Sequence, residues 1–184
     1  MDRKKTTEFL GNLLVSERFG GMGKYWAKEV SIDPWAAKGK PKRIDYMQFV
    51  PDGQCAVSDI EKGIFVCYEI KSCKQDVYSG NGLNFLGEKN YIVTTMECYK
   101  DLLQDFRDGT IARHLREVAP DSSMHFGIMV AIPFMSETAD EFQNPTEIDY
   151  ENGRWKLAVI QQCTPGRRKR PMTELLFCML RSGH

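Results

Sequence analysis

Long apolar runs are missing from this sequence of 184 residues. No stretch approaches the roughly 18 apolar residues that a membrane-spanning helix needs, and no apolar segment follows a charged start, as it does in a secretory signal. We therefore expect a cytoplasmic protein that does not bind membranes. A charge imbalance is also missing, because 25 basic residues balance 25 acidic ones. Any affinity for nucleic acid must then come from local basic patches.

Common metal-binding and nucleotide-binding patterns are absent as well. The cysteines form no C-x-x-C pair, and His114 and His125 have no partner at the spacing of metal ligands, so no zinc site is predicted. We expect reduced thiols at all six cysteines: Cys55, Cys67, Cys73, Cys98, Cys163 and Cys178. The glycines near position 80 are not followed by G-K-[ST], which excludes a P-loop. The acidic stretch 137–151 does not have EF-hand spacing, and we expect a solvated or partner-facing loop there.

What the sequence does contain is an alternation of strand-like and helix-like segments. The length and the hydrophobic content of 42% suit one soluble domain, residues 1–184. A helix from Thr6 or Thr7 to Phe19 is expected, and residues 54–63 are expected to be an irregular connection. The further helices are expected at 97–108, 110–118 and 172–180, and the strands at 25–32, 43–49, 64–72, 91–95, 126–134 and 155–163. This pattern predicts an α/β fold, with a central mixed sheet of five or six strands flanked by helices.

Two of these strands carry the residues of greatest chemical interest. Glu69 and Lys71 are two positions apart, so their side chains project from the same side of a strand. Asp45 adds a second carboxylate if its strand pairs with theirs. Two acids can hold a divalent metal ion, and an adjacent lysine can position or deprotonate a water molecule. The alternative is a solvated salt bridge on an outer face, worth little energetically. The strand is apolar on both sides before Glu69, however, which is typical of a buried central strand.

These residues resemble the signature of the PD-(D/E)xK nuclease superfamily. The resemblance rests on Asp45, on Glu69-Ile70-Lys71 and on the following Ser72–Asp76, with Ile44 standing where the superfamily name has proline. It continues through residues 79–93, which are similar to small nuclease-like proteins of phages and Gram-positive bacteria, and it covers roughly residues 24–107.

The resemblance implies a restriction-endonuclease-like core and hydrolysis of DNA that depends on Mg²⁺ or Mn²⁺. Asp45 and Glu69 would bind the ion, the carbonyl group of Ile70 could complete its shell, and Lys71 would orient or activate the attacking water. The sequence does not decide between one metal ion and two. An inactive module of the same fold that binds nucleic acid or a partner protein is the alternative function.

A third acid remains open between two main candidates. In nucleases of this kind the first helix often supplies one, and Glu17 lies near the core-facing stripe that contains Leu10 and Leu14. Glu8 belongs to the exposed first turn, where an acid favours the helix dipole. Glu29, on the first strand, is the rival of Glu17.

Contacts with nucleic acid are expected from basic segments and from a loop. Residues 79–90 are rich in glycine and asparagine, which suits a loop at the rim of a cleft where backbone amides can approach a phosphate. Ser72 can cap a short helical turn through Asp76. Asp76 could orient Lys71 or face the substrate, and capping or solvation also explains it. The expected contact residues are Lys40, Lys42, Arg43, Lys74, Lys89, Asn90, Arg167, Arg168, Lys169 and Arg170. Each basic stretch is also explained by simple solvation.

DNA is therefore the expected partner, together with a replication or recombination protein if the chain acts in a complex. No helix-turn-helix or zinc-finger pattern is present, so binding is expected to be structure-selective or loosely selective. Formation of a homodimer is left open.

Overall fold

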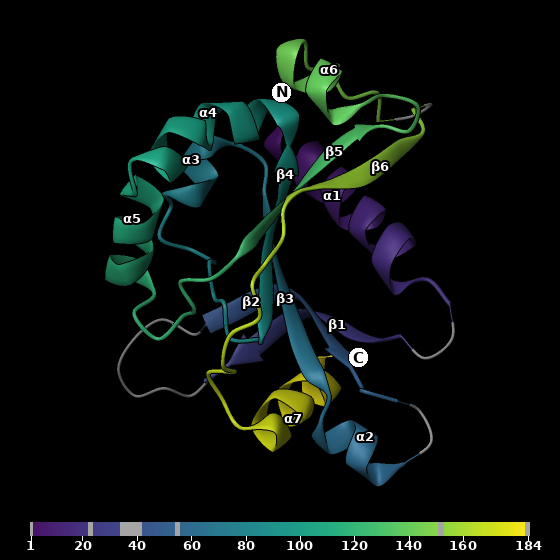
Figure 1. Cartoon of the computed structure of the whole chain (residues 1–184), viewed down its shortest axis with the longest axis vertical. Coiled ribbons are helices and arrows are strands. Elements are labelled where there is room, and N and C mark those ends of the chain that lie inside the picture. Colours follow the sequence, from purple (N-terminus) through teal and green to yellow (C-terminus); the bar gives the residue numbers. More distant parts are fainter. Residues whose placement is uncertain (1, 22–23, 34–41, 54–55, 151–152, 183–184) are drawn as a thin grey trace.

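The computed structural model describes residues 2–21, 24–33, 42–53, 56–150 and 153–182. Its centre is one sheet of six strands, within the predicted five or six, and the strands lie in chain order (Figure 1). The strands are β1 (Tyr25–Ile32), β2 (Lys42–Val50), β3 (Ile64–Lys71), β4 (Lys89–Thr95), β5 (Gly127–Pro133) and β6 (Trp155–Gln161). The pairs β3–β4 and β4–β5 are parallel, and the other three are antiparallel. The sheet is therefore mixed, and the α/β class is confirmed.

Helices cover both faces of this sheet. Helix α1 (Arg3–Leu14), which continues into the π-helical turn η1 (Val15–Phe19), packs on one face against β3, β4 and β6. On the other face α7 (Met172–Ser182) packs against β1. The crossovers between the parallel strands contain α3 (Lys74–Val77), α4 (Met96–Arg107) and α5 (Thr110–Val118), which lie on the side opposite α1 (Figure 1).

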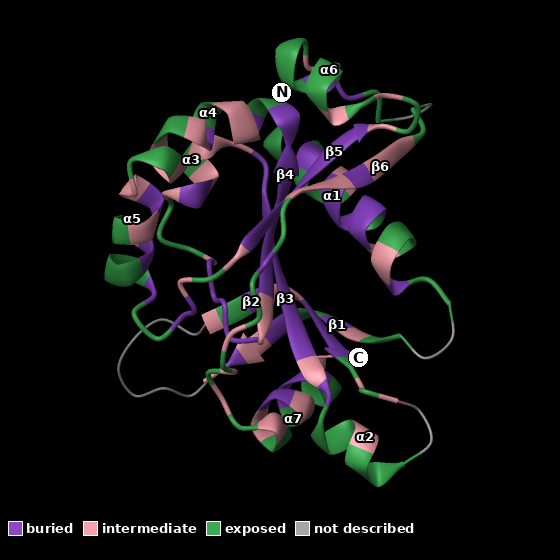
Figure 2. Ribbon diagram, viewed as in Figure 1, coloured by how far each residue is buried: buried purple, intermediate pink, exposed green. Residues whose placement is uncertain are grey.

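Strand β3 is the buried central strand that its sequence predicts. Val66, Tyr68 and Ile70 face α1, whereas Phe65 and Cys67 face the opposite side with α7. The alternation of side chains along a strand produces this division, and Figure 2 shows β3 buried along nearly its whole length. Because Glu69 and Lys71 continue the Phe65 and Cys67 series, they lie on the face away from α1.

Some local expectations differ from the structure. Asp2, not Thr6 or Thr7, caps α1, since its carboxylate accepts from the backbone N–H groups of Lys4 and Lys5. Two short helices, α2 (Val57–Glu61) and α6 (Thr138–Gln143), occupy stretches that were expected to be irregular. Each is under two turns long, too short for a clear helical periodicity in the sequence.

None of the helices in the described part of the chain combines the length and the apolar character needed to span a bilayer. The five cysteines other than Cys55, which lies outside the described residues, carry free thiols.

Candidate functional site

Asp45 lies where β2 and β3 diverge. The register of the two strands runs from Val50 opposite Ile64 to Tyr46 opposite Tyr68. Beyond that point Oδ2 of Asp45 accepts a hydrogen bond of 2.8 Å from the backbone N–H of Ile70. The carboxylate thus takes the place of a backbone acceptor, which fixes Asp45 at the end of the ladder and beside β3.

Glu69 is fully buried, at 0% exposure. Its Oε1 accepts a hydrogen bond of 3.1 Å from the backbone N–H of Asn84. Its Oε2 is buried and has no hydrogen-bond partner in the described structure. Burial and then the negative charge of Asp45 raise the pKa of Glu69 to about 8, against the opposing effects of Lys71 and of backbone N–H donors. A buried carboxyl oxygen without a partner is unusual and needs an explanation.

Lys71 lies beside Glu69 and is only 4% exposed. Its Nζ donates a hydrogen bond of 2.9 Å to the carbonyl oxygen of Asn81. The backbone of Gly82 passes over the carboxyl group of Glu69 and the amino group of Lys71. A Cβ atom built on this glycine would lie 2.5 Å from Oε2 of Glu69 and 2.7 Å from Nζ of Lys71. The ends of the two side chains therefore both lie directly beneath Gly82.

Asp45 belongs to the same electrostatic cluster. Burial raises its pKa above the ordinary value of 3.8, while the hydrogen bond from Ile70 and the positive charge of Lys71 act in the opposite direction. Asp45 in turn raises the pKa of Glu69. The structure thus brings together the three residues that the sequence singles out, at the ends of β2 and β3.

The two candidates for a third acid have different positions. Oε2 of Glu17 accepts a hydrogen bond of 3.1 Å from the backbone N–H of Leu157, on the edge strand β6. Leu157 packs in the core under α1, on the opposite face of the sheet from Glu69. The prediction that Glu17 joins the site is therefore wrong, because η1, the turn that carries this exposed residue, lies on the other face of the sheet.

Glu29 is closer to the cluster, since its charge contributes to raising the pKa of Asp45. It is an exposed residue, however, and forms an ion pair of 2.7 Å with Arg43. Glu29 therefore lies at the periphery of the site. Glu8 is exposed on α1, as expected.

Asn90 is not available to nucleic acid, contrary to prediction. It is 0% exposed, and its amide donates to the carbonyl oxygens of Gly87 and His125 and accepts from the N–H of Gly87. The side chain holds the turn before β4 in place. A polar residue beside a loop was expected to be exposed, but here the loop folds over it.

Many of the cations expected to contact DNA are paired with acids. Lys42 pairs with Asp121, Arg43 with Glu29, and Lys74 with Asp105, at 2.9, 2.7 and 2.7 Å. Lys89 is half-buried, and Lys40 lies outside the described residues.

The basic run near the C-terminus divides into two pairs. Arg168 lies over the ring of Phe65 and pairs with Glu88, and Arg170 pairs with Asp33 and Glu174. Arg167 and Lys169 are exposed and form no ion pair within the described ranges.

The backbone of this run lies near the candidate site. The N–H of Lys169 donates to the carbonyl oxygen of Leu86, two residues beyond Asn84. The pKa of Asp121 is lowered mainly by Lys42, with smaller contributions from Arg170 and Lys169. The run and the start of β2 therefore form one basic region around Asp121.

The role of Asn84 could not be read from the sequence. Its backbone N–H holds Glu69, and its side-chain amide donates a hydrogen bond of 2.8 Å to the carbonyl oxygen of Arg43. It thereby joins the loop after α3 to β2. The glycine and asparagine content of residues 79–90 indicated a loop, but gave no sign of which backbone group would meet the carboxylate.

The donor set fits a divalent cation in part. Asp45 and Glu69 provide two carboxyl groups. Oε2 of Glu69 has no hydrogen-bond partner, and a bound cation would supply the interaction that this buried oxygen lacks. Within the residues that the structure describes, no three or more histidine, cysteine, aspartate or glutamate side chains are grouped as a metal site. Carbonyl groups and water would have to complete a shell, as is usual for Mg²⁺.

Comparisons with protein-family models, with curated proteins and with solved structures returned no match.

Proposed function

We propose that this protein is a DNA nuclease that hydrolyses phosphodiester bonds with Mg²⁺ or Mn²⁺, on a restriction-endonuclease-like PD-(D/E)xK core. One observation carries the proposal: a fully buried glutamate whose Oε2 has no partner lies beside a buried lysine and a second acid. Buried charges and polar atoms are costly unless they are satisfied, so such clusters are typical of functional sites.

Each residue has a distinct role in this proposal. Asp45 and Glu69 would hold the ion, with the carbonyl group of Ile70 as a further ligand. Asp45 is already oriented by its hydrogen bond from Ile70. The bound ion would polarise the phosphoryl group and neutralise its charge. Lys71, held on the same face as Glu69, would orient the attacking water or stabilise the negative charge that develops on the phosphate.

The basic region supports DNA as the substrate. Arg167 and Lys169 are exposed on a run whose backbone bonds to residues 86 and 88, just beyond Asn84, where they could contact backbone phosphates without reading sequence. Because these contacts carry no specificity, a replication or recombination partner, or a second copy of the chain, would help to select the substrate.

An inactive binding module is the second candidate. The burial of Glu69 and Lys71 favours it, since neither group is open to a substrate as the chain is folded here.

The test is incubation of the purified protein with linear, nicked, branched and single-stranded DNA, in Mg²⁺ or Mn²⁺. Cleavage is expected to be lost in Glu69→Gln and Lys71→Met. The matched controls Glu61→Gln and Lys62→Met change the same residue types at exposed positions on or next to α2, and should cleave like the parent.

Cleavage that survives both site substitutions would remove these residues from the mechanism. Binding of DNA without any cleavage by the parent would favour the inactive module.

A further inference from the structure

The cluster is closed by a segment of the chain that follows α3. Glu69 is 0% and Lys71 4% exposed, so a phosphodiester cannot reach either group in this conformation. Gly82 stands over both of them. A cavity of about 500 Å³, lined in part by Thr95 and Trp155, is not lined by any residue of the cluster.

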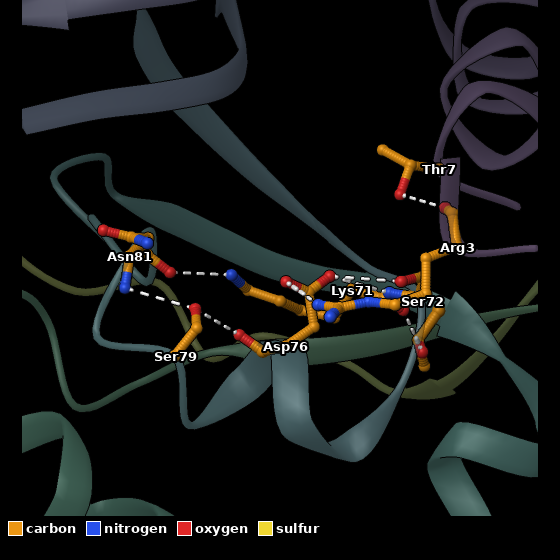
Figure 3. A network of polar contacts seen from close by, with 8 residues as sticks. Arg3, Thr7, Lys71, Ser72, Asp76, Ser79 and Asn81 are labelled. Atoms are coloured by element: carbon orange, nitrogen blue, oxygen red, sulfur yellow. Dashed lines mark hydrogen bonds and ion pairs between the residues drawn. The ribbon is translucent and has the colours of Figure 1, made fainter. Parts of the chain in front are cut away.

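The tip of the covering segment, at Asn81, is held by fewer contacts than the residues that follow it, Leu83 and Asn84 (the far arm). Asn81 is exposed, and its carbonyl oxygen accepts the 2.9 Å hydrogen bond from Lys71. Its own N–H makes only a long bond of 3.4 Å, to Oγ of Ser79 (Figure 3). Gly80 and Gly82 flank it with φ angles of +73° and +78°, a region that glycine enters without steric cost.

The far arm, by contrast, is built into the core. Leu83 is 1% exposed, and its carbonyl oxygen accepts a hydrogen bond of 3.0 Å from Oγ of Ser122, which in turn accepts from the N–H of Phe85. Asn84 is tied to β2 through the carbonyl oxygen of Arg43.

The near end is fixed as well. Asp76 accepts from the backbone N–H of Ser72 and pairs with Arg3 of α1, and its own carbonyl oxygen accepts from Oγ of Ser79 (Figure 3). A short exposed tip therefore lies between two anchored ends.

We infer that residues 80–82 form a lid, closed in this structure, whose tip occupies the place of a substrate phosphate and must lift to admit one. The carbonyl oxygen of Asn81 meets Lys71 as a phosphate oxygen would, and the backbone of Gly82 fills the space above Oε2 of Glu69. The two glycines are the hinges, because they can change φ and ψ widely without a clash.

This inference rests on the proposed function only in naming phosphate as the group that replaces the lid. The motion itself can be tested without any nuclease assay. A lid that opens in a protein that cleaves nothing would separate the two proposals, and so would cleavage by a protein whose lid never opens.

The first experiment measures how often Lys71 becomes accessible in the parent protein. Amine acylation of Lys71 and thiol alkylation of Cys67 are followed by peptide mass spectrometry, and each rate is divided by the rate in the urea-unfolded chain. Cys67 is a suitable reference because it is 0% exposed on the same face of the same strand, away from the lid. If the lid opens locally, the normalised modification rate of Lys71 should exceed that of Cys67 by about tenfold or more. Equal protection would mean that Lys71 is reached only by global unfolding, and would overturn the inference.

The second experiment uses two glycine substitutions that carry the same backbone strain. Both Gly80→Ala and Gly82→Ala place a Cβ at positive φ, but only the second meets Glu69 and Lys71, while nothing lies within 4 Å of the first. Gly82→Ala should therefore hold the lid away and speed acylation of Lys71 well beyond the effect of Gly80→Ala. If the two substitutions changed the acylation rate of Lys71 equally while Cys67 stayed protected from alkylation, the lid would be contradicted.

Discussion

Glu69→Gln tests the electrostatics of the cluster through the pH dependence of stability. The pKa of Glu69 in the folded protein is about 8, compared with an ordinary value of 4.5. The folded state therefore binds this proton more tightly than the unfolded chain does. The resulting stabilisation is fully present below pH 4.5 and is lost as the pH rises through about 8.

The size of the effect follows from the two pKa values. A tenfold difference in proton affinity corresponds to about 1.4 kcal/mol, so the free energy of unfolding should fall by on the order of a few kcal/mol between these pH values. Glutamine resembles the protonated acid and does not titrate. The variant should therefore match the parent near pH 5 and be more stable than the parent near pH 8.5.

The assay is urea denaturation of parent and variant at both pH values, with EDTA to exclude divalent ions. Glu61→Gln, at an exposed position of α2, should leave the pH dependence of the parent unchanged. An identical loss of stability with pH in the parent and in Glu69→Gln would refute the reasoning, because the buried carboxyl would then not be the group that releases the proton.

Two further predictions concern residues outside the cluster. Asn90→Leu should lower the free energy of unfolding, measured in urea, by about 2–4 kcal/mol, since it leaves buried backbone groups of Gly87 and His125 unpaired. An unchanged midpoint of urea unfolding would show that water takes the place of the amide. Joint replacement of Arg167 and Lys169 by alanine should weaken DNA binding and reduce the slope of log affinity against log salt by about two. Arg168→Ala should instead lower the free energy of unfolding, because it removes the ion pair with Glu88 and the contact with the ring of Phe65. If this variant lost as much DNA affinity as the double variant, the assignment of Arg168 to stability and of Arg167 and Lys169 to DNA binding would be contradicted.

Local patterns were enough to locate most of the strands. The expected strand at 25–32 coincides with β1, and the expected bounds of β3 and β6 differ from the structure by only one or two residues. These segments are found because the alternation of side chains and the preference for branched and aromatic residues act within a few positions. The same locality explains why α2 and α6 were missed, since one or two turns leave no period to detect.

The shared side of Glu69 and Lys71 on a buried strand follows from the order of residues alone, because side chains two positions apart on a strand point the same way. The groups that surround these two side chains depend instead on how distant elements pack together. Glu17 meets Leu157 across 140 positions of the chain and is thereby carried to the opposite face of the sheet. The covering of the site by Asn81 and Gly82 likewise depends on how a loop returns over its own strand. Such contacts are set by the packing of whole elements, which no short stretch of residues encodes.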